Sequence, residues 1–344
     1  MNKTMSSHSL HRLEIASRIV RSLHQQLEEQ VKAIYVCSSV ARGEADAHSD
    51  IDLHLVYWEP GSSFKMYATL EEGIAVDWVW EPLEDYSRVE EILSHYAKPH
   101  NLAHAVILYD PEGWLSHMKH QVVPQLGSKS YVTQRLARLW ELKHMSFQRV
   151  IQTESFEAFV PAFMEDFRIG CLLPLTACIV DPSARKLLYQ AGRSLEKLDA
   201  EAGDSLRSDL PQSESQMLLR VFGCHDFSKS EAYYFLDRMM ETYDYCIEVQ
   251  KADYHGINQP KRSCYSGGIR QWIGEGYHRE AMYPILDWMW VAEYRITKDS
   301  GCIGWWTAYK EELFQRLGLT PEGMQAKKEQ LIAVHHKLQQ ACSG

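Results

Sequence analysis

The amino-acid sequence predicts an α+β fold in which a small mixed sheet with covering helices (residues 1–125) precedes an all-α helical bundle (residues 126–344). Three observations support this division. A chain of 344 residues exceeds what one hydrophobic core usually holds. Short β-prone segments gather in the first 125 residues, and beyond Tyr131 the sequence changes to long stretches rich in Leu, Arg, Glu and Ala. We therefore expect two domains.

The individual elements follow from periodicity. Apolar residues between Leu10 and Leu27 recur at steps of three and four, which predicts a helix with one buried face. Short or alternating apolar segments predict strands over residues 33–36, 51–57, 74–80 and 105–109. The acidic run 81–91 is interpreted as a solvated helix face, and the glycine-rich segment 251–276 as a long loop that serves as a lid or a connector.

Composition limits the partners. A formal net charge of -10 argues against a protein whose main affinity is for nucleic-acid phosphates, and suits a cationic partner better. The eight cysteines form no CxxC pair, and no apolar run approaches the ~18 residues of a membrane span. These features predict a reduced, cytoplasmic chain without a membrane partner, and they leave the oligomeric state open.

Three aspartates stand out in the predicted strands. Side chains alternate along a strand, so Asp50 and Asp52 share one face while the apolar residues of 51–57 occupy the other. Two adjacent carboxylates repel unless a cation lies between them, and oxygen ligands suit Mg²⁺. Asp77 lies between the apolar residues of the strand 74–80, where a carboxylate is unfavourable without a partner. For Asp50 and Asp52 alone, a solvated edge strand is the alternative.

The segment 37–43 supplies a candidate phosphate site. It combines the end of a strand, the small hydroxyl residues Ser38 and Ser39, a predicted helix start and Arg42. Backbone amides and Ser39 would contact a triphosphate, and Arg42 would add positive charge. Carboxylates from two strands can hold two metal ions about 4 Å apart, which points to phosphoryl or nucleotidyl transfer chemistry.

The stretch that contains these residues resembles the signature of the DNA polymerase beta nucleotidyltransferase superfamily: Ser38-Ser39-Val40-Ala41-Arg42-Gly43-Glu44-Ala45-Asp46-Ala47-His48-Ser49-Asp50-Ile51-Asp52-Leu53. In that family a Gly-Ser pair precedes an Asp-x-Asp by about ten residues, and a third aspartate follows on a nearby strand, as Asp77 does. The resemblance implies metal binding by Asp50, Asp52 and Asp77, with Asp77 also a candidate activator of the acceptor hydroxyl. The family's glycine is replaced here by Ser38.

Within the superfamily, the chain is similar in size and in its helical second half to bacterial aminoglycoside and lincosamide nucleotidyltransferases. This resemblance implies transfer of a nucleoside monophosphate, from ATP or another NTP, onto a hydroxyl of a small molecule, with Mg²⁺ as cofactor. The acidic charge favours a cationic acceptor such as an aminoglycoside. The alternatives are a transferase for a protein or tRNA, and a catalytically silent nucleotide-binding module.

Three carboxylates of the helical half are candidates for a catalytic base, because a glutamate from this domain serves as base in the antibiotic-modifying relatives. An exposed helix carboxylate is the favoured interpretation for each of these residues, which are Glu141, Glu165 and Asp166. The sequence leaves open whether any of them acts as a base, which base the NTP carries, which acceptor is used and where it is modified.

Overall fold

The computed structural model describes residues 5–27, 31–58, 65–201, 214–248, 257–296 and 303–342. The chain divides into two compact units, one formed by residues 1–131 with 251–268 and the other by residues 132–250 with 269–344. The sequence-based division at 125/126 placed the segment 251–268 in the second part, whereas in the structure this segment packs with the first.

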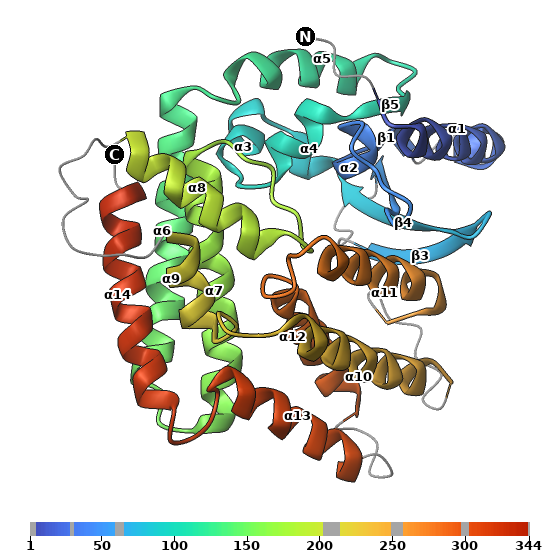
Figure 1. The fold of residues 1–344 in the computed structure, drawn as a ribbon. Coiled ribbons are helices and arrows are strands. Elements are labelled where there is room, and N and C mark those ends of the chain that lie inside the picture. Colours follow the sequence, from blue (N-terminus) through green and yellow to red (C-terminus); the bar gives the residue numbers. More distant parts are fainter. Residues whose placement is uncertain are drawn as a thin grey trace. The chain divides into compact units, whose positions relative to one another are not determined.

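The first unit is built around a five-stranded mixed sheet with the strand order β3-β4-β2-β1-β5 (Figure 1). Strands β2 and β4 are parallel, and the other neighbours are antiparallel. This confirms the predicted sheet class. Strand β3 was not predicted, because it is a half-exposed edge strand without a continuous apolar face. The strands are β1 (Val31–Val36), β2 (Ile51–Tyr57), β3 (Lys65–Glu71), β4 (Ile74–Pro82) and β5 (Val106–Tyr109).

One face of the sheet packs against α1 (Ser7–Leu27), as the periodicity predicted. Ile15, Ala16 and Val20 of this helix are buried in one cluster with the alternate apolar residues of β2 and β4. The short helix α2 (Ser38–Ala41) follows β1 and adds its buried Val40 to the same cluster. This cluster fixes the register of β2 and β4, since a shift of one residue would expose every apolar side chain.

The opposite face of the sheet is covered by helices that come after β4. Tyr35 and Val56 of the sheet lie in a second apolar cluster with residues of these helices, including Ile92 and Leu115. The covering elements are the 3₁₀ turn η1 (Leu83–Tyr86), α3 (Val89–Ser94), α4 (Lys98–His104), α5 (Trp114–Val122) and the 3₁₀ turn η2 (Val123–Gln125).

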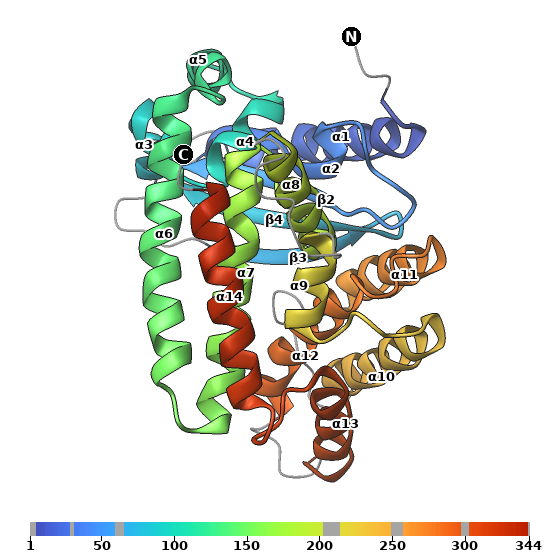
Figure 2. The same cartoon turned by 60° about the vertical axis from the view of Figure 1, so that its left-hand side comes forward.

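The second unit is helical, which confirms the predicted helical half. Figure 2 shows α7 and α14 side by side along their length. Among the residues that the structure describes, no helix is both long and apolar enough for a transmembrane span. Beyond η2 the helices are α6 (Lys129–Gln152), α7 (Phe156–Ala177), α8 (Leu187–Glu201), α9 (Glu214–Phe222), α10 (Lys229–Glu248), α12 (Met282–Ile296), α13 (Ile303–Leu317) and α14 (Met324–Cys342).

Two interpretations of polar segments were wrong. The predicted loop 251–276 contains helix α11 (Gln259–Gly274), which begins in the first unit and ends in the second, and residues 251–256 lie outside the described residues. The Asn258 side chain caps this helix by accepting a hydrogen bond of 3.0 Å from the Lys261 amide. The acidic run 81–91 is not a solvated helix face throughout, because Glu81 is buried at the end of β4.

Candidate active site

The three predicted aspartates come together at one end of the sheet. Asp52 and Asp77 are direct partners in the parallel pairing of β2 with β4, and Asp50 immediately precedes β2. One ligand oxygen from each of the three carboxylates lies within 4.8 Å of the others. The alternation of side chains along the two strands therefore places all three carboxylates on the side opposite the α1 cluster, as expected.

The turn before Asp50 is held by hydrogen bonds from the first helix. Arg12 is almost fully buried, and its guanidinium donates to the carbonyl oxygens of Ser49 and Ala47 at 2.7 and 3.0 Å. The Asp46 carboxylate accepts hydrogen bonds from the His48 amide at 2.8 Å and the Ser49 hydroxyl at 3.0 Å. A buried guanidinium and a closed turn thus fix where β2 begins and where Asp50 lies.

Ser38 adopts a backbone conformation that explains the family's glycine. Its φ angle is 56°, in the left-handed region that L-residues with a side chain rarely adopt. Cys37 precedes it in extended conformation and donates its amide to the Asp52 carbonyl at 3.2 Å. The turn from β1 into α2 therefore requires positive φ at position 38, directly beside the metal-ligand candidates.

The other predicted phosphate ligands lie in or just after α2. Ser39 belongs to the first turn of α2, and its carbonyl accepts the Glu44 amide at 2.8 Å. Arg42 lies at the carboxyl end of the same helix, where its Nε donates to the Glu44 carboxylate at 3.0 Å. The structure places Ser38, Ser39 and Arg42 on one turn-and-helix segment next to the aspartates, and their contact with a phosphate stays a prediction.

Lysine 261, which the sequence did not single out, lies among the three carboxylates. Its ammonium forms ion pairs with the Oδ2 atoms of both Asp50 and Asp77. The lysine side chain is 3% exposed, and it enters the site from the first turn of α11. Asn258 followed by Pro260 was the available sequence signal, because this pattern is typical of a helix start. The five glycines of the segment 251–276 indicated a loop instead.

Burial and mutual repulsion change the ionisation of the carboxylates. Burial raises the pKa of Asp77 to about 7, with repulsion from Asp50 and Asp52 adding to the increase and Lys261 opposing it. Burial and the Asp50 charge likewise raise the pKa of Asp52. Burial would lower the pKa of Lys261, but the negative charges of Asp50 and Asp77 raise it well above its usual value. The ammonium is thus charged at neutral pH.

The donor set fits a divalent cation. The Asp77 side chain is buried, and its Oδ1 atom has no hydrogen-bond partner among the described residues. A buried oxygen without a partner is unfavourable, and a cation would satisfy it. Three carboxylates outweigh the single positive charge of Lys261, and carboxylate oxygens are the ligands that Mg²⁺ prefers in proteins. Asp50, Asp52 and Asp77 are the residues that would hold the ion.

Two of the three candidate bases of the helical half pair with other side chains, and the third is exposed. Asp166 is fully buried in the second unit, where its carboxylate pairs with Lys143 at 2.5 Å and accepts from the Ser146 hydroxyl at 2.9 Å. The prediction of an exposed helix carboxylate is therefore wrong for Asp166. Glu165 is a surface residue paired with Arg149 at 2.5 Å, and Glu141 is exposed.

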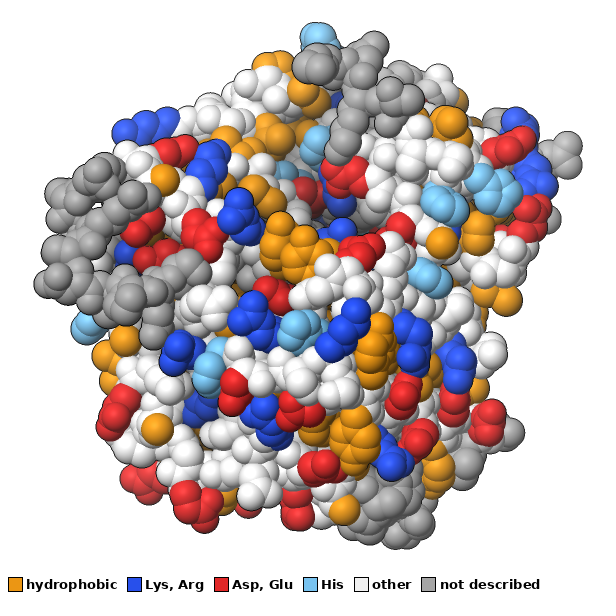
Figure 3. Space-filling model, viewed as in Figure 1, with side chains coloured by type: hydrophobic (Ala, Val, Ile, Leu, Met, Phe, Trp, Pro, Cys, Tyr) orange, Lys and Arg blue, Asp and Glu red, His pale blue; other side chains and the backbone are white. Residues whose placement is uncertain are grey.

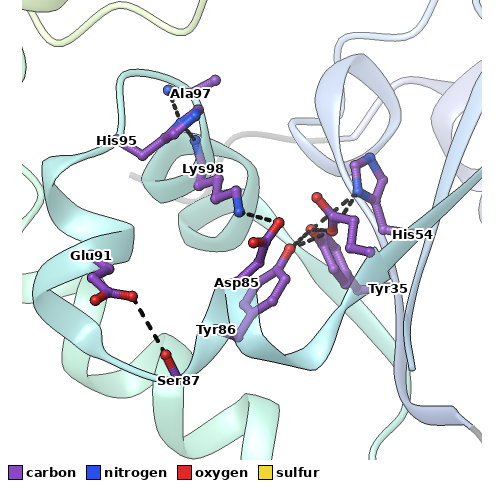
Figure 4. A network of polar contacts seen from close by, with 10 residues as sticks. Tyr35, His54, Asp85, Tyr86, Ser87, Glu91, His95, Ala97 and Lys98 are labelled. Carbon is purple, nitrogen blue, oxygen red and sulfur yellow. Dashed lines mark hydrogen bonds and ion pairs between the residues drawn. The ribbon is translucent and has the colours of Figure 1, made fainter. Parts of the chain in front are cut away.

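A buried polar network lies along the sheet beyond Asp52. Glu81 Oε2 contacts His54 Nδ1 at 3.0 Å and accepts hydrogen bonds from the hydroxyls of Tyr35, at 3.0 Å, and Tyr86 (Figure 4). Burial would raise the pKa of Glu81, but the charge of His54 and these hydrogen bonds lower it to about 2. Burial alone would lower the pKa of His54, but interactions with Cys37 and Glu81 raise it well above its usual value. The His54 charge also opposes the raised pKa of Asp52.

Comparisons with known proteins add little to this geometry. No protein-family model matches the sequence, and no curated protein matches it. The chain is similar to the solved structure of a nucleotidyltransferase-like protein from Exiguobacterium sibiricum 255-15, with 12% sequence identity over 76% of this chain and 92% of that chain. The TM-score is 0.35, which is too low to establish a common fold. The functional conclusion therefore rests on the site itself.

Proposed function

We propose that this protein is a magnesium-dependent nucleotidyltransferase that moves a nucleoside monophosphate from an NTP onto an acceptor hydroxyl. The observation that carries the proposal is the convergence of Asp50, Asp52 and Asp77, whose ligand oxygens lie within 4.8 Å of one another beside the turn at Ser38. The orphaned Oδ1 of Asp77 adds a buried acceptor that a cation would satisfy.

In the proposed reaction, the acceptor oxygen attacks the α-phosphorus of the NTP, a new P–O bond forms, and the bond to the β-phosphate oxygen breaks to release pyrophosphate. The bound divalent ion would stabilise the negative charge on the phosphates. Asp77 is the proposed acceptor of the hydroxyl proton, because its carboxylate converges with those of Asp50 and Asp52 and its Oδ1 atom has no hydrogen-bond partner among the described residues. Ser38, Ser39 and Arg42 would position the triphosphate.

ATP is the proposed donor, and a hydroxylated small molecule such as an aminoglycoside or a lincosamide is the proposed acceptor. The net charge of -10 supports a cationic acceptor over a tRNA. On the face drawn in Figure 3, the described acidic and basic side chains are interspersed, which is not the clustered basic surface that a polynucleotide requires. A protein acceptor remains the alternative within the same chemistry.

A transfer assay tests this proposal. The protein is incubated with Mg²⁺, each of the four NTPs and a panel of aminoglycosides and lincosamides, and the products are analysed by mass spectrometry. The Asp50→Ala/Asp52→Ala variant is the control. We expect a mass gain of one nucleoside monophosphate on one compound, which is lost in the control. No gain on any compound would contradict the antibiotic acceptor and direct the search to protein acceptors.

The second candidate is a nucleotide-binding module without transferase activity. The ion pairs of Lys261 favour it, because an ammonium that permanently occupied Asp50 and Asp77 would exclude the metal. This candidate predicts that no NTP yields a transfer product with any acceptor, and that triphosphate binding does not depend on Mg²⁺.

A further inference from the structure

Lys261 contacts two of the three carboxylates that a divalent ion would need. Its Nζ atom pairs with Oδ2 of Asp50 and with Oδ2 of Asp77, and both acids belong to the three whose oxygens converge within 4.8 Å. The lysine side chain is 3% exposed and the Asp77 side chain 6%. A metal ion held by these carboxylates and the buried ammonium repel each other, because both are cations close together in a site with little solvent screening.

The lysine is delivered by a fixed helix rather than by a loose surface chain. Asn258 caps α11 through the Lys261 amide, so the lysine backbone lies in the first helical turn. Six residues later, Gly267 packs against the imidazole of His48, and a Cβ atom there would come within 2.1 Å of His48 Nδ1. The cap fixes where the helix begins, and the contact of Gly267 with His48 holds the helix against the turn that leads into Asp50.

The side chain itself can leave without movement of the helix. Lysine carries its charge on a four-carbon stem with rotatable bonds, so the ammonium can swing away while the backbone stays in place. Besides the two carboxylates, the ammonium lies 5.6 Å from the ring centroid of Tyr265, one turn further along α11. The carboxylates therefore supply the main attraction that holds the ammonium in the site.

We propose that Lys261 is a built-in competitor of the divalent metal, which holds Asp50 and Asp77 together in the metal-free protein and must withdraw before the ion binds. The inference rests on the proposed function and adds a regulatory step to the same site. The ammonium offsets part of the repulsion among the three carboxylates, whose ligand oxygens lie within 4.8 Å of one another. Competition predicts that metal affinity is lower than the carboxylate set alone would give.

The test measures Mn²⁺ binding to the full chain without nucleotide, by titration calorimetry, for the wild type and for Lys261→Met. Methionine is unbranched and one atom shorter than lysine, so it keeps most of the buried stem and removes the charge. We expect Lys261→Met to bind Mn²⁺ at least about tenfold more tightly than the wild type, because the ion no longer displaces a buried ion pair. Lys98→Met is the matched control, since it removes another ion pair of the first unit, with Asp85 at 2.7 Å, away from the three aspartates.

Thermal unfolding supplies a second readout, which also reports the stability of the protein without a metal ion. In EDTA, Lys261→Met should melt at a lower temperature than the wild type, because the three carboxylates lose the ammonium that offsets part of their repulsion. Mn²⁺ should restore the melting temperature of Lys261→Met and raise that of the wild type much less. If Lys261→Met does not fold in EDTA, Lys261→Gln, which keeps a hydrogen-bond donor without the charge, takes its place.

The outcomes separate the two proposals. Equal or weaker Mn²⁺ binding by Lys261→Met, with binding by the wild type intact, would overturn the competition while the metal-dependent function stands. Absence of Mn²⁺ binding in the wild type, in Lys261→Met and in Lys261→Gln would overturn both proposals. Tighter binding by Lys261→Met but no transfer product with any acceptor would support the competition and count against the transferase.

Discussion

Ser38 shows how a single backbone angle relates to a sequence signature. In the sequence, Ser38 stands where the superfamily that this stretch resembles has a glycine. In the structure the position has a φ of 56°, so the turn itself favours glycine, whatever ligand is bound. Serine adopts this conformation at an energetic cost, because L-residues with a side chain are disfavoured in the left-handed region.

Replacing Ser38 isolates this cost. Ser38→Gly and Ser38→Ala both remove the hydroxyl, so any difference between them reports the backbone. We expect Ser38→Gly to be more stable than Ser38→Ala by about 1 kcal/mol, since the left-handed penalty on alanine exceeds the extra chain entropy of glycine. Urea denaturation of the two variants measures the difference. Equal stability, or a more stable alanine variant, would show that position 38 does not need positive φ in solution.

The aspartates could be predicted at the residue scale, whereas Lys261 could not. Asp50, Asp52 and Asp77 follow from the two-residue period of two strands and from a motif whose spacing is local. Lys261 lies 184 residues beyond Asp77 in the sequence. No local pattern records that pairing, and a lone lysine in a glycine-rich segment is usually a surface residue.

At the scale of elements, the network around Glu81 joins three strands and the turn that follows them. Tyr35 comes from β1, His54 from β2, Glu81 from β4 and Tyr86 from η1, and in Figure 4 the labelled side chains of Tyr35, His54 and Tyr86 converge. A buried carboxylate with three such partners is stabilising only while the set is complete. The sequence placed Glu81 in a solvated acidic run because composition does not show which member of a run faces the core.

Glu81→Gln should destabilise the protein in a pH-dependent way. The lowered pKa of Glu81, about 2, means that the charged glutamate stabilises the fold above its unfolded pKa, and that this contribution is lost as pH falls toward 2. The raised pKa of His54 means that its contribution is complete below its unfolded pKa and is lost as pH rises through the folded value. The free energy of unfolding of the wild type should therefore exceed that of Glu81→Gln most clearly between about pH 4.5 and 6.5, by about 3 kcal/mol.

Urea denaturation of both proteins from pH 3 to pH 9 measures this difference. A stability gap that does not vary with pH would contradict the charged Glu81–His54 pair, and would assign the loss to packing alone.

Helix α11 illustrates why an element can be missed while its neighbours are predicted. Glycines at 267 and 268 suggested a loop, because glycine is unfavourable inside helices. In the structure, Gly267 lies against the ring of His48, where no side chain would fit. A tertiary contact therefore accounts for a glycine that local propensity assigns to a loop. Because the glycines indicated a loop, the helix that carries Lys261 was not predicted.

For the whole molecule, composition and periodicity were sufficient to predict a mixed sheet followed by helices, because these features depend on local patterns summed over long segments. Composition and periodicity could not show that the segment 251–268 belongs to the first unit, because that unit's other residues lie more than a hundred positions earlier in the sequence. The candidate site is therefore built from a local motif together with one distant residue. That residue bears directly on whether the site takes up a metal.

The proposed function requires that the three aspartates bind triphosphate through a divalent ion. Calorimetric titration of ATP into the wild type and Asp52→Asn, each in Mg²⁺ and in EDTA, tests this most directly. We predict that the wild type binds ATP in Mg²⁺ and loses most of that affinity in EDTA, and that Asp52→Asn binds weakly in both because a metal ligand is missing. ATP binding by the wild type that is equally tight in Mg²⁺ and in EDTA, and unchanged in Asp52→Asn, would contradict the account.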